Sequence, residues 1–557
     1  MSSNLETLKL ESRHLRGTLA LELANAEPGF SEASQHLLKP HGFYQQKDRD
    51  RRKDAAPPPP ALMVRGRIPA GRLDALAWST WDRLADEFGD GSLRITTRQS
   101  LELHGILKGD LKATLKGLRD ALQTSSGACG DVVRNVVAPP NPTGRPEVQA
   151  LAEVAAVLSD HFRARSRAYA EIFLDGEPVD PVTEAEPIFG ATYLPRKFKI
   201  AVTLAGENAV DLFTHDLGLA ATWAEGRITG WHLFAGGGMG MSHGNDQTFP
   251  RLADPLGWFP AEGLLAVVEA AVTAYRDSGD RTNRKRARLK YVLHDRGAAW
   301  FRAEVETRSG VRFQDLEPPP WTTPSLLGWH AAGDGTYAFG LHTLSGRIND
   351  GPERRLKTAL REAVARFHLH VQLTPEQDLI LEGIPSGDRP ALEALLRDHG
   401  VLLDRPASAY NRALACVALP WCGLAVAEAE RHLPQFLDHL QAALDRHGKA
   451  HLAPTFRVTG CANGCARPYA AELALVGQAP ERYVLWAGGD AEGTRLAFPV
   501  VEKVPSADLP GLFDRLVNFW TSEGRLDERL GAFAHRIGPG ALAAALTAAP
   551  ALSGLER

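Results

Sequence analysis

The chain has 557 residues, a formal net charge of −4 and 23% charged residues. This composition is ordinary for a globular protein, and the length predicts about two to four domains. No run of about eighteen apolar residues is present, so no membrane-spanning helix is expected, and the net charge indicates neither a nucleic-acid nor a membrane partner. The first residues include Glu6 and Glu11 and lack an apolar signal segment, which together with the few cysteines predicts a cytoplasmic protein.

The chain begins with a polar segment. Residues 1–60 form a predicted N-terminal arm, which ends in a proline run at residues 57–60 that is typical of a stiff, extended spacer. Proline clusters recur at residues 139–146 and 318–324. These three proline-rich points suggest boundaries between domains.

Residues 93–106 align without gaps with residues 371–384, and the two segments share Thr, Gln, two Leu, Gly and Ile at equivalent positions. Any two amphipathic strands share leucine spacing, so a chance match is the alternative, but the shared Thr, Gln and Gly favour duplication. Two related halves would pack about a pseudo-twofold axis, and we expect a cofactor between them.

The first copy of this repeat alternates apolar and polar residues with period two, as an amphipathic strand does. Its polar face carries Thr96, Arg98 and His104. In the second copy Glu376 and Glu382 replace Arg98 and His104. We therefore predict that only the first copy forms an anion-facing strand.

Other segments predict a mixture of helices and strands. Apolar residues at three-to-four spacing predict a helix over residues 261–275, and a second helix is expected over residues 425–447. Strand-like runs occupy residues 169–174, 199–204 and 482–486. Because helices and strands are interleaved, the sequence predicts an α+β protein.

Four of the five cysteines fall within fifty positions of one another: Cys416, Cys422, Cys461 and Cys465. Four thiolates are the ligands of a cubane iron–sulfur cluster. The alternatives are four unrelated buried thiols and a structural zinc site, although the five-residue gap between the first two cysteines is wider than zinc pairs usually show. Cys129 has no neighbouring cysteine, so we expect it to be a buried thiol.

The two cysteine pairs, with the second in Thr459-Gly-Cys-Ala-Asn-Gly-Cys-Ala-Arg467, resemble those of the siroheme-dependent nitrite and sulfite reductase family. The resemblance covers nearly the whole chain. It implies that the four cysteines hold a [4Fe-4S] cluster, that Cys465 also ligates the siroheme iron, and that Asn463 lies beside the cofactors. Gly460 and Gly464 would then let backbone amides approach the cluster sulfides and raise the reduction potential.

Siroheme carries eight carboxylates and sulfite is an anion, so a site for both must gather cations. Four basic residues lie in segments that resemble the family's substrate-binding segments: Arg65, Arg134, Lys197 and Lys199. By itself each is more often a solvated surface charge, but the resemblance implies that they surround sulfite. Three further residues are implied to lie along the macrocycle: Thr96, Arg98 and His104. The Lys-x-Lys pattern resembles sulfite reductases, whereas nitrite-reducing relatives commonly carry Asn at its second position.

Two other segments are open to several interpretations. The basic run at residues 281–290 could bind nucleic acid, form a solvated face or, as the resemblance favours, bind siroheme carboxylates. The glycine-rich stretch at residues 235–240 is not followed by the Lys and Ser or Thr of a phosphate-binding loop, so close backbone approach to a cofactor is the inference.

The resemblance implies a duplicated nitrite/sulfite reductase fold, α+β in class, with ferredoxin-like half-domains and mixed α/β cofactor domains. Five domains are predicted in chain order: an arm for partner contact, a half-domain, a siroheme- and substrate-binding domain, a second half-domain, and a domain for the cluster and siroheme. Their predicted bounds are residues 1–60, 61–126, 127–325, 326–404 and 405–557.

The implied function is the assimilatory reduction of sulfite to sulfide with six electrons, at a siroheme coupled to a [4Fe-4S] cluster. No dinucleotide-binding fingerprint is present, so electrons must come from a partner. Residues 41–50 resemble the family's hemoprotein branch and favour an NADPH-dependent flavoprotein, whereas Gly130 resembles the ferredoxin-dependent branch. The alternatives are a ferredoxin-dependent nitrite or sulfite reductase, a zinc-stabilised nucleic-acid-binding protein and a homologue that binds tetrapyrrole without catalysis.

Overall fold

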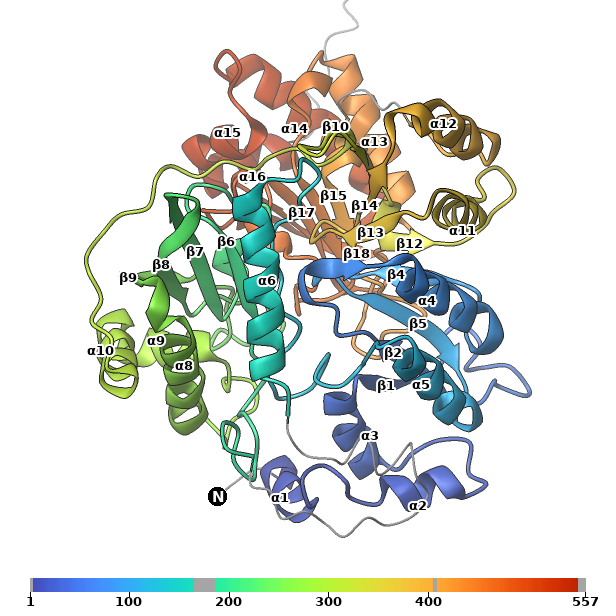
Figure 1. Ribbon diagram of the computed structural model, residues 1–557. Coiled ribbons are helices and arrows are strands. Elements are labelled where there is room, and N and C mark those ends of the chain that lie inside the picture. Colours follow the sequence, from blue (N-terminus) through green and yellow to red (C-terminus); the bar gives the residue numbers. More distant parts are fainter. Residues whose placement is uncertain (1–3, 165–185, 404–407, 549–557) are drawn as a thin grey trace, which may run out of the picture. The chain divides into compact units, whose positions relative to one another are not determined.

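The computed structural model describes residues 4–164, 186–403 and 408–548. The chain falls into two compact units, of which the first comprises Met1–Gly238 and Asn245–Asp404 and the second Met239–Gly244 and Arg405–Arg557. Helices and strands are interleaved in both units (Figure 1), which confirms the predicted α+β class. The strand predicted at residues 169–174 lies outside the described residues. No helix in the described part of the chain combines the length and apolar character needed to cross a membrane.

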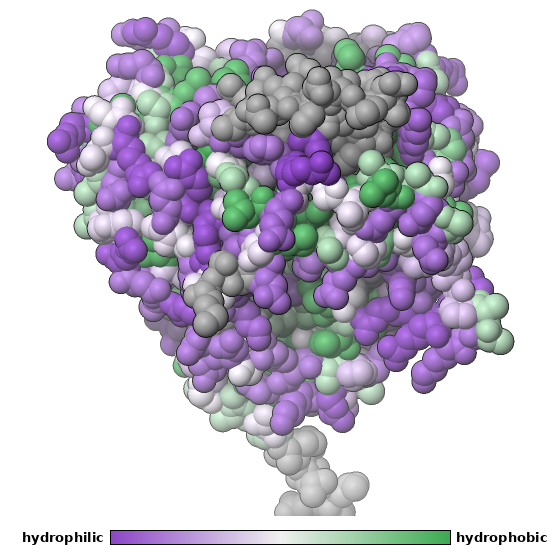
Figure 2. Space-filling model, turned by 90° about the horizontal axis from the view of Figure 1, so that it is seen from below, coloured by the Kyte–Doolittle hydropathy of each residue, from purple (hydrophilic) through white to green (hydrophobic). Residues whose placement is uncertain are grey.

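The N-terminal arm is folded as far as residue 46. Its elements are α1 (Asn4–Glu11), α2 (Leu19–Ala24), α3 (Glu32–Leu38), η1 (Lys39–His41) and β1 (Phe43–Gln46). Leu19, Leu38 and Phe43 are completely buried, so the arm contributes to the core although its composition is polar. Figure 2 views the molecule from the side of α1–α3 and shows mostly hydrophilic side chains, with apolar ones scattered among them. Residues 57–60, the proline run, belong to no helix or strand, and their extended conformation stays a prediction.

Two five-stranded sheets with helices form the half-domains of the first unit. The first sheet has the order β1-β2-β5-β4-β12 and the second the order β10-β11-β14-β13-β3. The first sheet adds the strands β2 (Ala61–Arg65), β4 (Leu93–Ile95), β5 (Leu101–Ile106) and β12 (Arg347–Ile348). The second consists of β3 (Arg72–Leu73), β10 (Gly328–Ala331), β11 (Tyr337–Leu341), β13 (His370–Leu373) and β14 (Leu379–Ile384). The accompanying helices are α4 (Ala75–Phe88), α5 (Leu111–Asp120), α11 (Leu356–Phe367) and α12 (Arg389–Asp398).

Each sheet takes its edge strand from the other copy of the repeat. β12, from the second copy, pairs antiparallel with β4, and β3, from the first copy, pairs antiparallel with β13. Figure 1 shows the yellow strands of the second copy beside the blue strands of the first. The exchange is reciprocal, as a duplicated pair of halves requires, so the predicted duplication is confirmed.

The repeated segment is a hairpin in both copies, and the prediction of one amphipathic strand is wrong. In the first copy β4 and β5 pair antiparallel around a turn at residues 96–99, where the amide of Gln99 donates to the carbonyl of Thr96 over 3.1 Å. The second copy turns in the same way between β13 and β14. Gln99 and Gln377 occupy equivalent positions and both have positive φ, at 51° and 67°. Alternating polarity does not distinguish one strand from two strands joined by a tight turn.

These two glutamines also join the copies. The side-chain amide of Gln99 donates to the carbonyl of Leu373 over 2.9 Å, and that of Gln377 donates to the carbonyl of Ile95 over 3.3 Å. Leu373 and Ile95 are equivalent residues of the repeat, so the two bonds are related by the pseudo-twofold axis. Both glutamines are buried, which makes each bond costly to lose.

A second duplicated pair of sheets carries the remaining strands. The sheet in the first unit consists of β6 (Ile200–Leu204), β7 (Leu217–Ala224), β8 (Arg227–Ala235) and β9 (Asp254–Pro260). The sheet in the second unit consists of β15 (Ala413–Ala415), β16 (Phe456–Thr459), β17 (Leu473–Ala479), β18 (Arg482–Ala487) and β19 (Phe498–Pro505). β6 and β7 are parallel, as are β16 and β17, and the following strands are antiparallel.

Equivalent helices follow the two sheets. They are α8 (Leu264–Ser278), α9 (Leu289–Arg296) and α10 (Ala298–Ser309) in the first unit, and α14 (Leu509–Glu523), α15 (Leu530–Ile537) and α16 (Pro539–Thr547) in the second. β6 begins at 200 and β16 at 456, and β7 begins at 217 and β17 at 473, which is the same offset of 256. The loops between these strands therefore correspond residue by residue. α6 (Pro146–His161) and α13 (Leu433–Arg446) complete the described helices of eight or more residues.

The predicted elements of these sheets are found with shifted ends. The helix predicted at residues 261–275 is α8, and the strands predicted at 199–204 and 482–486 are β6 and β18. The helix predicted at 425–447 begins only at Leu433. The preceding segment is held in another conformation, because the amides of Val426 and Ala427 donate to the carbonyl of Gly460 over 2.8 and 3.1 Å.

Replacing Gln99 by Ala should weaken the join between the copies. The change removes the bond to Leu373 and leaves buried backbone groups unsatisfied, so we expect the free energy of unfolding to fall by about 2 kcal/mol. Urea denaturation followed by circular dichroism measures this loss. Gln149→Ala is the control, since its hydrogen bonds to Arg72 and Glu153 are exposed. Equal effects of the two changes would contradict a special role for Gln99.

Candidate active site

The structure brings the four clustered cysteines together in the second unit. Cys416 directly follows β15, and Cys461 and Cys465 lie in the loop after β16. Burial, followed by the charge of Cys465 and then those of Cys422 and Cys461, raises the pKa of Cys416. All four thiols are thus within electrostatic reach of one another, as the sequence motif predicts.

The surroundings of these thiols suit a metal cluster. Burial, and next the charge of Cys465, raise the pKa of Cys461 to about 11, so the thiolate form requires a compensating cation such as iron. The backbone amide of Gly460 donates to the sulfur of Cys416 over 3.3 Å, and the side-chain amide of Asn463 donates to that of Cys461 over 3.4 Å. Among the described residues no three His, Cys, Asp or Glu side chains converge on a single ion.

The glycines beside the cysteines are required by the protein's own packing. A Cβ on Gly460 would lie 2.5 Å from the carbonyl oxygen of Ala427, and one on Gly464, where φ is +61°, would lie 2.9 Å from the ring of Tyr469. Residues 239–244 of the glycine-rich stretch belong to this unit, and the amide of Met241 donates to the carbonyl of Ala462 over 3.0 Å. The approach of these amides to cluster sulfides stays a prediction.

The equivalent loop of the first unit has no thiols. At the offset of 256, Ala205 and Ala209 occupy the positions of Cys461 and Cys465. The backbone correspondence holds through the loop, because Asp211 and its equivalent Arg467 both adopt the left-handed conformation, with φ of 51° and 57°. The duplicated fold thus offers one set of cysteine ligands and not two.

A group of cations surrounds Lys199 in the first unit. Lys197 and Lys199 are half-buried on either side of the buried Phe198, as the predicted alternation requires. Burial is the main cause that lowers the pKa of Lys199 well below its usual value. Four neighbouring positive charges lower it further: Arg98, Lys197, Arg288 and Arg134. So dense a group of like charges favours binding of an anion.

Asp216 holds the backbone at the start of this group. The amide of Lys199 donates to its carboxylate over 3.0 Å, and Arg288 forms an ion pair with it at 2.7 Å. Asp216 is completely buried. The carboxylate therefore fixes the position of Lys199 through the backbone and does not compete for its ammonium group.

The second unit repeats this frame, in which a buried acid binds a backbone amide and an arginine, but it lacks the lysine. Thr455 occupies the position of Lys199, and its amide donates to Glu472 over 2.9 Å. Arg529 pairs with Glu472 as Arg288 pairs with Asp216. Sequence reasoning missed Asp216, although the acid found 256 residues later in the chain could have identified it.

Arg134 and Arg65 differ in their partners. Arg134 is 8% exposed and donates to the carbonyl of Gly130 over 3.2 Å, and within the described residues it forms no ion pair with a carboxylate. Arg65 donates from Nε to the carboxylate of Glu102 over 2.8 Å and from Nη1 to the sulfur of Cys129 over 2.8 Å. Arg134 therefore has the greater capacity to bind an anion. Cys129 is buried, as expected.

Tyr44 lies beside Arg65 and is influenced by the charge of Arg134. The sequence did not identify it as a site residue. Its ring centroid lies 5.8 Å from the guanidinium carbon of Arg65. Burial and then the charge of Cys129 raise the pKa of Tyr44, whereas the charges of Arg134 and Arg65 lower it. The arm thus contributes a phenol to the cationic group, which the sequence pattern of the arm did not indicate.

The three residues implied to lie along the macrocycle bind neighbouring protein groups. Arg98 donates to the carbonyl of Asn135 over 2.6 Å and to that of Ile200 over 3.0 Å, and its own amide donates to the hydroxyl of Thr96 over 3.2 Å. His104 is buried, with Nδ1 3.2 Å from the side-chain oxygen of Gln46. These bonds fix the hairpin against β6, and contact with siroheme stays a prediction.

The basic run at residues 281–290 is not a solvated face. Five of its six basic side chains are bound individually: Arg281 to Glu6, Arg284 to Asp131, Arg286 to Asp295, Arg288 to Asp216, and Lys290 to the carbonyl of Gly238. The sixth, Lys285, is exposed. Burial, and next the charge of Arg288, lower the pKa of Lys290 to about 6. The arrangement excludes a continuous nucleic-acid patch, because these side chains are used within the protein.

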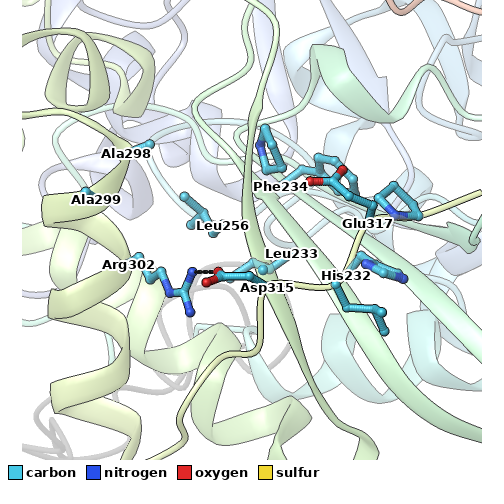
Figure 3. A pocket seen from close by; sticks show the side chains of 13 residues that line it. His232, Leu233, Phe234, Leu256, Ala298, Ala299, Arg302, Asp315 and Glu317 are labelled. Carbon is cyan, nitrogen blue, oxygen red and sulfur yellow. Dashed lines mark hydrogen bonds and ion pairs between the residues drawn. The ribbon is translucent and has the colours of Figure 1, made fainter.

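A cavity of about 270 Å³ lies between β8, β9, α10 and the segment after α10. Figure 3 shows Arg302 of α10 pointing toward Asp315, with which it forms an ion pair, while His232 and Glu317 lie on the other side. None of the predicted site residues lines this cavity. Its one guanidinium already has a carboxylate partner, so it is not an anion site.

Replacing Cys465 by Ser should abolish cluster binding, because a hydroxyl is a poor ligand for iron. We expect loss of most protein-bound iron and acid-labile sulfide, measured on the purified protein. Cys129→Ser is the matched control and should retain both. Normal iron content in the Cys465 variant would show that this cysteine is not a ligand.

Comparison with known proteins identifies related domains and related chains. The family model described as nitrite and sulphite reductase 4Fe-4S domain matches residues 153–313, and the nitrite/sulfite reductase ferredoxin-like half domain matches residues 57–121 and 330–399. The first match covers the copy of the α/β domain that lacks the four cysteines. The two half-domain matches correspond to the two interlocked sheets.

Similar proteins extend over almost the whole chain. A sulfite reductase [ferredoxin] of Synechococcus elongatus is 42% identical over 97% of this chain and 90% of its own length. A sulfite reductase [NADPH] hemoprotein beta-component of Shewanella putrefaciens is 42% identical over 96% of both chains. The structure of Mycobacterium tuberculosis NirA protein matches with a TM-score of 0.76 at 23% identity, over 96% of this chain and 95% of that one, and shows the same fold. The chain belongs to the nitrite and sulphite reductase family.

Proposed function

We propose that the chain is the siroheme- and cluster-binding component of an assimilatory sulfite reductase and reduces sulfite to sulfide. The observation that carries the proposal is the cationic group around Lys199, which occurs in the copy that lacks the clustered cysteines, while the other copy supplies all four of them. Sulfite is the substrate named for relatives that are 42% identical over nearly the whole chain. A lysine at position 199 also favours sulfite over nitrite, as the sequence pattern indicated.

The residues of the chain fit both cofactors of the family. Four thiols within electrostatic reach of one another suit a [4Fe-4S] cluster, with Cys416, Cys422, Cys461 and Cys465 as its ligands. The buried cation Arg134, which pairs with no carboxylate in the described part of the chain, suits the carboxylates of siroheme and an oxyanion substrate. When bound, these cofactors would pass electrons from the partner to the substrate, and the siroheme would supply an iron centre for its sulfur.

The cationic side chains would hold the oxyanion and supply protons. Lys197, Lys199 and Arg134 would donate hydrogen bonds to sulfite oxygens, and such bonds are strong in a site with little water. Because the pKa of Lys199 is lowered by burial and by its neighbours, its ammonium group gives up a proton more readily than a solvated lysine. Each departing oxygen requires protons to leave as water, and Lys199 is suited to this transfer.

The electron donor is the part of the proposal that the relatives leave open, since both a ferredoxin-dependent and an NADPH-dependent enzyme are among them. We favour an NADPH-dependent flavoprotein because residues 41–50 resemble that branch. Gly130, which resembles the ferredoxin branch, has a packing explanation: its φ is +82° and a Cβ there would lie 2.7 Å from the nitrogen of Pro40. Turnover with each reduced donor, compared on the same preparation, tests the choice, and turnover with ferredoxin alone would reverse it.

Replacing Lys197 or Lys199 by Ala should remove a hydrogen-bond donor from the site. We expect kcat for sulfite, measured with a reduced viologen, to fall by about 10²-fold, while the absorption spectrum of the holoenzyme is retained. Lys285→Ala is the control, since Lys285 is exposed in the basic run. Unchanged kinetics in both lysine variants would remove them from the site.

Replacing Asp216 by Asn should displace Lys199 and leave Arg288 without its carboxylate. We expect kcat/KM for sulfite to fall by about tenfold or more and its pH profile to shift, because the ammonium group loses its fixed place. Glu472→Gln is the matched control: it breaks the equivalent frame in the second unit and should leave the pH profile unchanged. Equal pH profiles for Asp216→Asn and the wild type would reduce Asp216 to a purely structural role.

A further inference from the structure

A second, smaller cavity lies where the N-terminal arm meets the segment that carries Arg134. It has a volume of about 30 Å³. A water molecule needs about 10–15 Å³ on this measure, so the space suits one small ion and is too small for an organic molecule. Arg134 lines the cavity, and its charge also contributes to lowering the pKa of Lys199. It therefore faces both the cavity and the cationic group described above.

The charges around this cavity are strongly unequal. Five cations line it: Lys9, Lys39, Arg134, Arg196 and Arg284. Asp131 is the single carboxylate among the lining residues. Lys9, Arg284 and Arg196 share it, at 3.1, 2.8 and 3.7 Å. Lys9 also pairs at 2.6 Å with Glu6, which does not line the cavity and is shared with Arg281. Two carboxylates cannot neutralise the five cations, so positive charge remains in the cavity wall.

Two of the cations have no carboxylate partner in the part of the chain that the structure describes. The Nζ atom of Lys39 lies 3.2 Å from Nδ1 of His36 and 5.9 Å from the ring centroid of Tyr44. Arg134 donates to a single backbone carbonyl, that of Gly130. Both side chains thus keep hydrogen-bond donors that an anion in the cavity could use.

The like charges also act on one another. Burial and then the charge of Arg284 lower the pKa of Lys39, and burial, followed among the cations by Arg284 and Arg134, lowers that of Arg196. Burial and then the charge of Lys39 lower the pKa of His36, which favours its neutral form. His36 therefore does not offset the positive charge of the cavity. Such mutual repulsion is relieved when an anion binds between the groups.

We propose that the cavity formed by Lys39, Arg134 and Arg196 is a second oxyanion site, which holds sulfite next to the catalytic cations. Its identification as a sulfite site rests on the proposed function; the preference for a small oxyanion rests on volume and charge. The arginines offer the paired donors that match two oxygens of such an ion. Because Lys39 belongs to η1, the arm has a role in substrate capture that is independent of any partner.

Binding of sulfate to the oxidised holoenzyme tests the site without turnover. The midpoint of thermal unfolding is measured in sodium sulfate and in sodium chloride of equal ionic strength. We expect sulfate to raise the midpoint of the wild type by about 2 °C or more at saturation. Lys39→Gln, which keeps much of the side-chain stem, should lose at least half of this shift. Lys285→Gln, an exposed lysine that does not line the cavity, should keep it.

The double variant Lys197→Ala/Lys199→Ala separates the two sites. It should retain a sulfate-dependent shift that the further change Lys39→Gln removes. A full shift in Lys39→Gln, or complete loss of the shift in the double lysine variant, would overturn the proposal. Arg196→Gln is measured in the same way, so that the outcome does not depend on the folding of one variant.

Steady-state kinetics give an independent readout. Lys39→Gln should raise KM for sulfite roughly tenfold, with kcat retained, and should weaken the dependence of kcat/KM on ionic strength. An unchanged KM would contradict a role in substrate capture. If the wild type binds sulfate but does not reduce sulfite, the proposed function fails while the oxyanion site stands, so the two failures are distinguishable.

Discussion

The reciprocal hydrogen bonds of Gln99 and Gln377 fix the geometry on which the site depends. Each glutamine reaches from the turn of its own hairpin to the backbone of the other copy, so neither hairpin can shift without breaking the pseudo-twofold join. The hairpin of the first copy also carries Arg98, whose guanidinium holds the carbonyls of Asn135 and Ile200. Through these bonds the join between the half-domains determines where β6 begins, and with it the position of the lysines just before that strand.

Duplication has provided two equivalent frames, and each copy has kept a different chemistry. In both, a buried acid accepts a hydrogen bond from the backbone amide just before a strand: Asp216 from Lys199 before β6, and Glu472 from Thr455 before β16. The first frame therefore presents an ammonium group where the second presents a hydroxyl. The loop that follows the strand shows the reverse, since Cys461 stands where the first copy has Ala205. A cationic site and a thiol site are thus produced by substitutions on one backbone, with no change of fold.

The sequence predicts those parts of the site that depend on local pattern. The cysteine motif, the alternation around Phe198 and the duplication could all be recognised from short segments. Features set by distant contacts could not be recognised in this way. The late start of α13 depends on hydrogen bonds to the carbonyl of Gly460, and the hairpin depends on a turn that alternating polarity does not reveal. The folded arm was hidden by its polar composition, because Leu19, Leu38 and Phe43 are few but completely buried. Asp216 was missed because its role depends on the fold, which brings the amide of Lys199 and the guanidinium of Arg288 to its carboxylate.

Positive charge without nearby carboxylates is costly for the folded protein and useful for its function. An unpaired buried ion costs several kcal/mol after relaxation, and among the described residues Arg134 pairs with no carboxylate and donates to the backbone carbonyl of Gly130. Adding a carboxylate beside it would stabilise the fold but would also occupy the donors that an anion needs, as Glu102 does for Arg65. In the first copy Asp216 instead binds the backbone amide of Lys199. It therefore fixes the position of the lysine without neutralising the ammonium group. Anions that bind here therefore contribute to the stability of the protein as well as to its chemistry, which couples occupation of the site to the integrity of the fold.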